Sequence, residues 1–140
     1  MALAALACAG GELAVPARGE DGAFKIIVHP GISLTEIDRG YLSQVFLKKI
    51  AVWGSGEAIR PVDLPLESPT RAKFTTEVLK RSVGAVRTYW QQVIFAGRGV
   101  PPPELGSDAE VVAYVLKHPG AIGYVPGNTD VHNARVLTIR

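Results

Sequence analysis

The run Phe24–Val28, with the sequence Phe-Lys-Ile-Ile-Val, constrains the fold of this chain more than any other stretch. It is rich in β-branched and aromatic residues and is closed by His29-Pro30-Gly31, which predicts a strand that ends at a turn. A half-exposed strand alternates apolar and polar residues, whereas this run is almost continuously apolar. We therefore expect a strand covered on both faces, as in a sheet flanked by helices.

Helical and extended patterns alternate along the rest of the chain. The spacing of apolar residues and the capping residues predict helices after Asp38, Ser68 and Ser107, another over Val86–Phe95 after a break at Ser82-Val83-Gly84, and strands at Ile59–Leu64, Ala121–Val125 and Arg135–Ile139. Trp53-Gly54-Ser55-Gly56 reads as a turn. Since 140 residues suffice for one domain, we predict a single α/β domain with a mixed sheet over residues 24–140.

Composition argues against several classes of function. The 15 basic and 13 acidic residues are spread along the chain, so no basic stripe for nucleic acid is formed. The three histidines lie too far apart to suggest zinc, and the single cysteine excludes an internal disulfide. No phosphate loop of the Walker kind, Gly-x-Ser-x-Gly elbow or convincing acid and base pair is found. We therefore expect neither an enzyme nor a cofactor.

The segment Pro61–Phe74 carries the candidate site, because an apolar strand there runs through a loop into a helix. Ser68 is the natural N-cap, and Pro69 follows at the first helical position. Arg71 then lies in the first turn, where the helix dipole disfavours cations, so a negative group should be nearby. Glu67 is the ordinary candidate for that group, and a bound anion held by the free N–H groups and the guanidinium is the functional one.

Two further stretches leave alternatives open. Tyr89-Trp90 lies among apolar residues at helical spacing, so it is expected to belong to the core rather than to form a stacking surface. Residues 97–103 (Gly-Arg-Gly-Val-Pro-Pro-Pro) cannot continue a helix and predict an extended loop. That loop is a possible docking element for another protein.

The first seventeen residues have a different composition from the rest. They are mostly Ala, Leu, Gly and Val and end in Val15-Pro16-Ala17, which resembles a secretory signal peptide with its cleavage site. No Lys or Arg precedes Arg18, so the true start could lie upstream, and an Ala-rich tail is the alternative. Ala5-Leu6-Ala7-Cys8 is a weak lipoprotein-like box. The apolar run is too short for a membrane span.

Two motifs give a specific family resemblance. Residues 42–53 (Leu-Ser-Gln-Val-Phe-Leu-Lys-Lys-Ile-Ala-Val-Trp) resemble the "LSxIFLGKIxxW" segment of phosphate-binding proteins of ABC transporters. Residues 119–125 (Pro-Gly-Ala-Ile-Gly-Tyr-Val) resemble the "PGAIGYV" segment of the same family. Ser68-Pro69-Thr70 occupies the position of its "SGT" phosphate loop. The resemblance covers about residues 24 to 126 and implies one lobe of the type 2 periplasmic-binding-protein fold.

The resemblance also implies a function and a site. It points to an exported, periplasmic or secreted domain that binds phosphate or a similar oxyanion through Ser68, Thr70 and Arg71, with an ABC transporter permease or a second copy as partner. Two positions depart from the family pattern, because Pro69 replaces the loop Gly and Leu64 stands where the family has a ligand-binding Arg. The alternative is a protein-interaction module that keeps the lobe without anion binding.

Overall fold

The structure, a computed structural model, describes residues 23–140. The predicted signal peptide at residues 1–17, including Cys8, lies outside the described residues. The strands of the described part are β1 (Phe24–Val28), β2 (Glu36–Ile37), β3 (Arg60–Pro61), β4 (Ala121–Pro126) and β5 (Arg135–Ile139). Its helices are α1 (Arg39–Phe46), α2 (Pro69–Phe74), the π-helical turn η3 (Thr75–Leu79), α3 (Val83–Phe95) and α4 (Asp108–Lys117).

The strands form one mixed sheet in the order β2-β5-β1-β4-β3. β1 runs antiparallel to both of its neighbours, β4 and β5, while β2 is parallel to β5 and β3 is parallel to β4. The four strands other than β1 therefore share one direction, and their carboxyl ends lie at the same edge of the sheet. The predicted α/β domain with a mixed sheet is confirmed.

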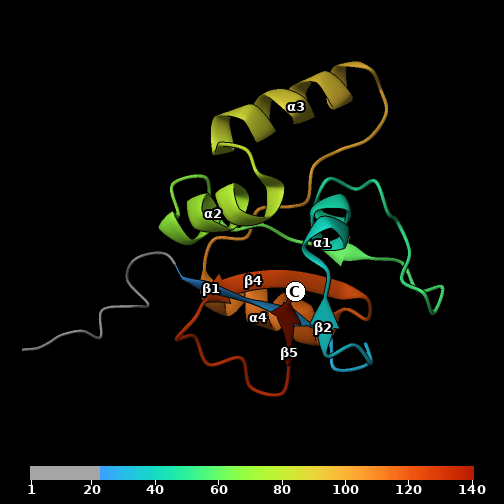
Figure 1. The fold of residues 1–140 in the computed structure, drawn as a ribbon, viewed down its shortest axis with the longest axis vertical. Helices are drawn as coiled ribbons and strands as arrows, with labels where there is room; N and C mark the ends of the chain where they lie inside the picture. The colour runs from blue at the N-terminus through green and yellow to red at the C-terminus, as the bar shows by residue number, and fades with distance from the viewer. Residues whose placement is uncertain (1–22) are drawn as a thin grey trace, which may run out of the picture.

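Helices cover both faces of the sheet, with α1 and α2 on one side and α4 on the other (Figure 1). Successive residues of β4 point to opposite faces of the sheet, because side chains alternate along a strand. The ring of Tyr124 stacks on Phe74 of α2, with centroids 4.0 Å apart, whereas Gly123 faces Val111 of α4. Between the layers, Ile26, Ile27 and Val28 of β1 are fully buried, which confirms the prediction made from their continuous apolar run.

The helix caps form as predicted at three positions. The carboxylate of Asp38 accepts hydrogen bonds from the N–H groups of Gly40 and Tyr41 at the start of α1. Ser68 and Ser107 cap α2 and α4 through their hydroxyl oxygens. These interactions depend on residues within one helical turn, which is why the sequence predicts them.

Other boundaries differ from prediction. The strand expected over Ile59–Leu64 is reduced to β3, with an isolated parallel bridge between Asp63 and Glu104 beyond it. The helix after Ser68 becomes π-helical before it ends at Lys80, which adopts a left-handed conformation with φ 60°. The expected break at residues 82–84 is the cap and first turn of α3, because the Ser82 hydroxyl accepts from the Ala85 N–H. The short strand β2 was not predicted.

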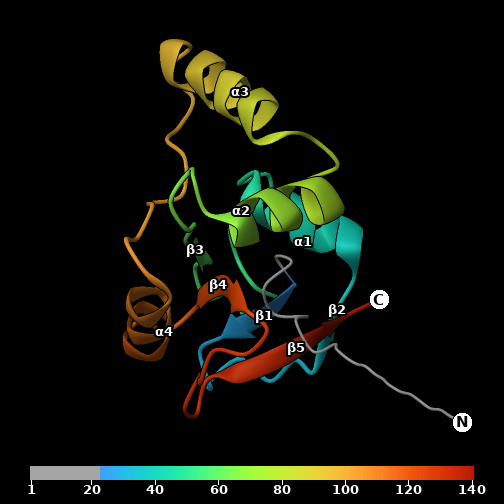
Figure 2. The same ribbon diagram turned by 90° about the vertical axis from the view of Figure 1, so that its left-hand side faces the viewer.

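Helix α3 lies outermost in both views of the ribbon, on the far side of α1 and α2 from the sheet (Figures 1 and 2). Val86, Trp90 and Val93 on one side of this helix are buried, so the assignment of Trp90 to the core is confirmed. At its end, Phe95 is 95% exposed and Val100 in the following loop is 61% exposed.

Among the residues that the structure describes, no helix is long and apolar enough to cross a membrane.

The close approach of α4 to β4 depends on the missing side chain of Gly123. A Cβ at this position would lie 2.8 Å from Cγ1 of Val111 and 3.1 Å from Cγ2 of Val62. We expect Gly123→Ala to lower the free energy of unfolding by about 1–3 kcal/mol, as overpacking of a tight core does. Gly54→Ala is the matched control, since a Cβ there meets nothing within 4 Å. Equal urea midpoints for the two variants would contradict this account.

Candidate functional site

The starts of two helices border one cavity of about 560 Å³ at the carboxyl ends of β3 and β4. Helix α2 begins there after the loop that follows β3, and α4 begins there after the loop that follows the proline run. Side chains able to bind a ligand line the cavity from both starts and from the segment after β4: Glu67, Ser68, Thr70, Ser107, Asp108 and Asn128. The structure thus brings together two predicted site residues, Ser68 and Thr70, with a second capping serine.

The α2 side of the cavity presents the donors predicted from the sequence. The hydroxyl oxygen of Ser68 accepts a hydrogen bond of 3.1 Å from the N–H of Arg71, which leaves its O–H free to donate. Pro69 has no N–H, and the next N–H in the turn is that of Thr70. Within the described residues, neither that N–H nor the Thr70 hydroxyl has a hydrogen-bond partner. Thr70 lines the cavity although it is only 5% exposed overall.

The α4 side offers a similar arrangement that the sequence predicted only as a helix start. Ser107 accepts a hydrogen bond of 3.2 Å from the N–H of Glu110. In a capping box the Glu side chain would accept from the N–H of the capping serine. Here Oε1 of Glu110 accepts instead from the N–H of Gly106, one residue earlier. Nothing in the local pattern indicates that this start faces the start of α2. The convergence arises from the parallel pairing of β3 and β4.

Arg71, the third predicted site residue, is placed differently. Its side chain is buried and does not line the cavity. One nitrogen, Nη1, donates to the carbonyl oxygen of Leu64 at 2.9 Å and to Oε2 of Glu104 at 2.7 Å. The other, Nη2, lies 3.8 Å from Oδ2 of Asp63. Glu104 and Asp63 are therefore its ion partners, and the Glu67–Arg71 pair considered from the sequence is not formed.

Asp63 and Tyr124 complete a buried network around this guanidinium. The Tyr124 hydroxyl donates to Oδ1 of Asp63 at 2.7 Å and accepts from the N–H of Leu64 at 3.2 Å. Burial raises the pKa of Asp63 above its usual value, and the charge of Arg71 opposes that shift. Burial and the adjacent Asp63 carboxylate raise the pKa of Tyr124 above its usual range, so this phenol stays neutral. The network fixes the loop between β3 and α2.

The electrostatics of the cavity are mixed. Two carboxylates, those of Glu67 and Asp108, line it, and among the described lining residues there is no lysine or arginine. The positive contributions are the N–H groups at the two helix starts, because the charge of Arg71 behind the loop is balanced by Glu104 and Asp63. In the described part of the chain, no group of three or more His, Cys, Asp or Glu residues could hold a metal ion.

Solved phosphate-binding proteins have a fold similar to that of this chain. A structure from Clostridium perfringens, described as a phosphate ABC transporter substrate-binding protein with bound phosphate, matches with a TM-score of 0.64 and 16% identity over 85% of this chain. PstS from Borrelia burgdorferi matches with a TM-score of 0.63 and 14% identity over 84% of this chain. An ABC-type phosphate transport receptor from Vibrio cholerae matches with a TM-score of 0.63 and 17% identity over 85%.

This chain spans less than half the length of those structures, since it covers 46%, 47% and 48% of them respectively. No protein-family model and no curated protein matches the sequence. At these identities the likeness shows the fold alone. The chain has a mixed α/β fold that matches a single lobe of the periplasmic-binding-protein fold, as the motifs predicted. Two of these neighbours are described as a substrate-binding protein and a transport receptor.

The buried guanidinium of Arg71 should contribute more to the free energy of unfolding than an exposed ion pair does. We expect Arg71→Met to reduce the free energy of unfolding by about 3–5 kcal/mol, because it leaves the buried Asp63 without its cation. Adding Asp63→Asn to this variant should recover part of the loss. Lys73→Met is the control, since its ion pair with Glu77 is exposed and should contribute less than about 1 kcal/mol. Equal losses for Arg71→Met and Lys73→Met in urea unfolding would refute the assignment.

The pKa shift of Asp63 predicts a pH dependence. Because its pKa is raised in the folded state, the folded protein binds this proton more tightly than the unfolded chain does. The wild type should therefore gain stability relative to Asp63→Asn as the pH falls from the raised pKa toward 3.8, and lose it as the pH rises. Urea unfolding of both proteins across this range measures the difference. A difference that is constant or moves in the opposite direction would contradict the shift.

Proposed function

We propose that this chain is an exported, non-catalytic binding-protein domain that recognises phosphate or a related oxyanion. In this proposal residues 1–17 are a signal peptide and residues 24–140 form the binding domain. The observation that carries it is the cavity between the starts of α2 and α4, in a fold like that of phosphate-binding proteins. Helix starts suit an anion because their free N–H groups point outward and the helix dipole favours negative charge.

Direct contacts with the anion are assigned to Ser68 and Thr70. The Thr70 N–H and hydroxyl and the Ser68 O–H are available donors on the α2 side, and Ser107 offers another hydroxyl across the cavity. Arg71 supports the site without contacting the anion, because both of the contacts of its Nη1 atom are with protein groups. Its charge is balanced by Glu104 and Asp63, and its hydrogen bond to Leu64 holds the loop in place.

The lining carboxylates favour a particular kind of oxyanion. Glu67 and Asp108 would repel a fully ionised anion, but a carboxylate accepts a hydrogen bond from an anion that still carries a proton. Hydrogen phosphate carries such a proton near neutral pH, and sulfate does not. The mixed lining therefore supports phosphate over sulfate as the ligand.

The proposal includes a partner, because a single lobe leaves one side of a bound anion in water. Ligand sites in proteins usually enclose most of the ligand surface. Tight binding should therefore need a second copy of this chain or another protein, and an ABC transporter permease is the partner that the fold likeness suggests.

Thr70→Val tests the anion site, since it removes a hydroxyl and nearly keeps the shape of the side chain. A hydrogen bond to a charged group contributes roughly 1.5–3 kcal/mol, so phosphate affinity should fall by about 10- to 100-fold in calorimetric titration. Thr76→Val is the matched control, because Thr76 is exposed and does not line the cavity. Melting temperatures without ligand check the fold of both variants. If millimolar phosphate neither binds nor stabilises the wild type, the proposal is wrong.

A second candidate function is a protein-interaction module without anion binding. The exposed apolar side chains at the end of α3 and in the next loop favour it, with Ile94 at 51%, Phe95 at 95% and Val100 at 61% exposure. This candidate keeps the lobe as a scaffold and uses residues 97–103 for docking. It gains support if phosphate fails the titration while Phe95→Ser weakens self-association or partner binding.

Export has its own test. We expect the mature protein to be found outside the cytoplasm and to begin near residue 18, because the apolar start ends in small residues at a cleavage-like site. Cell fractionation with N-terminal sequencing of the product measures both points. A cytoplasmic product that retains Met1, with no start codon upstream, would contradict export.

A further inference from the structure

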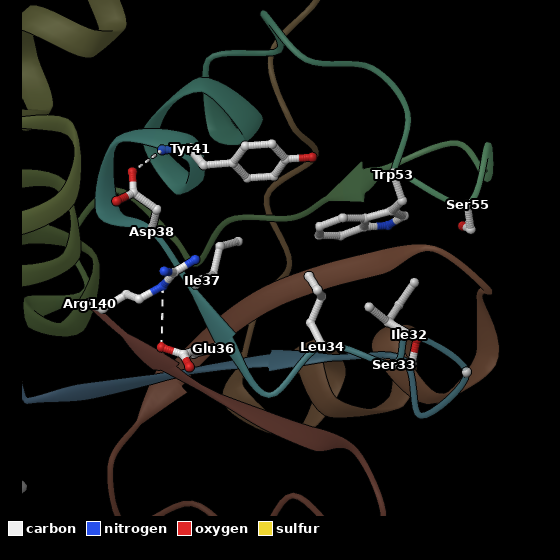
Figure 3. A pocket seen from close by; sticks show the side chains of 12 residues that line it. Ile32, Ser33, Leu34, Glu36, Ile37, Asp38, Tyr41, Trp53, Ser55 and Arg140 are labelled. Atoms are coloured by element: carbon white, nitrogen blue, oxygen red, sulfur yellow. Dashed lines mark hydrogen bonds and ion pairs between the residues drawn. The ribbon is translucent and has the colours of Figure 1, made fainter.

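A second cavity of about 380 Å³ lies beside β2, and it shares no lining residue with the candidate anion site. Its walls come from the turn after β1, from β2, from the start of α1 and from the Trp53 turn (Figure 3). Apolar side chains form most of the surface: Ile32, Leu34, Ile37, Tyr41 and Trp53. The volume is within the usual range for small-molecule sites. The proposed function does not use this cavity.

Two aromatic rings form one wall of the cavity. The rings of Tyr41 and Trp53 are inclined by 27°, with centroids 6.5 Å apart. The indole N–H of Trp53 donates to the carbonyl oxygen of Gly120 at 3.0 Å, which fixes the orientation of the ring. Since that donor is already bonded to the backbone, the indole offers a ligand its apolar surface and π-electrons. Leu34 and Ile37 lie across from the rings, as Figure 3 shows.

The charged side chains at the polar end of the cavity are two carboxylates and one guanidinium, those of Glu36, Asp38 and Arg140. Asp38 uses Oδ2 to cap α1, and among the described residues its Oδ1 has no hydrogen-bond partner. Glu36 forms an exposed ion pair of 3.2 Å with Arg140, so its charge is already balanced. Among the charged groups that line the cavity, the carboxylate of Asp38 is therefore left without a cationic partner.

We propose that this cavity binds a small organic cation that carries a ring. A ring can lie against the apolar side chains and the Tyr41–Trp53 wall, which bury apolar surface and attract positive charge through their π-electrons. The cationic group is then near Asp38. A ligand with a carboxylate would instead meet an acidic rim, so the chemistry selects against anions. The cavity thus has the opposite charge preference from the anion site proposed above.

Three probes of similar shape test this preference: phenethylamine as the cation, 2-phenylethanol as the neutral analogue and 3-phenylpropionate as the anion. The chain has two tryptophans, so heteronuclear NMR spectra of the full chain give two indole N–H signals. We expect phenethylamine to shift the Trp53 signal saturably and to leave the Trp90 signal in place. Trp90→Phe assigns the two signals. The neutral probe should bind about two- to fivefold more weakly than the cation, as an exposed charge contact suggests.

Two variants separate the charge from the apolar wall. Asp38→Asn keeps the helix cap, because Asn caps as well as Asp does, and should reduce the preference for the cation over the neutral probe to the part that the aromatic wall supplies. Leu34→Ala should weaken both probes by a similar factor. Val136→Ala is its control, since Val136 is also exposed and does not line the cavity. The proposal is overturned if no probe shifts Trp53 at millimolar concentration, if both tryptophans shift together, or if the anion binds as well as the cation.

Discussion

The buried guanidinium of Arg71 is the interaction on which the arrangement of this domain depends. It joins the start of α2, where Arg71 lies, to Leu64 and Asp63 at the end of the β3 region and to Glu104 in the segment before α4, which is 33 residues away in the sequence. Tyr124 adds β4 to the same network through its bond to Asp63. Because a buried cation without partners is costly, these contacts must form together. They determine where both helix starts at the candidate site lie.

This placement changes the role that a cation plays at the site. An arginine that reaches into the cavity would bind an anion directly and leave the loop to be held by other groups. Here the guanidinium holds the loop, and the cavity is left with hydroxyls, N–H groups and two carboxylates. Such a lining selects by hydrogen-bond pattern more than by net charge. A protonated oxyanion satisfies both kinds of lining group at once, because it can accept from the helix starts and donate to a carboxylate.

Features that depend on a few neighbouring residues could be predicted from the sequence, and those set by distant contacts could not. The strand Phe24–Val28 and the caps at Asp38, Ser68 and Ser107 are local and were predicted correctly. A cation at the start of a helix correctly indicated a nearby negative group, but sequence proximity favoured Glu67. The observed partner Glu104 lies 33 residues away and is brought in by the bridge between it and Asp63. The strand β2 is two residues long and exists through its pairing with β5.

The order of the strands in the sheet separates the candidate anion site from the aromatic cavity. The carboxyl ends of β2, β3, β4 and β5 share an edge, but β3 and β2 are the outermost strands on opposite sides of the sheet. The anion site is built at the end of β3 and β4, and the aromatic cavity is built against β2 and the start of α1. Between them lie β1 and β5, and the centre of β1 is fully buried. Because packed interiors resist deformation, a ligand bound in one cavity should not change the shape or the lining of the other.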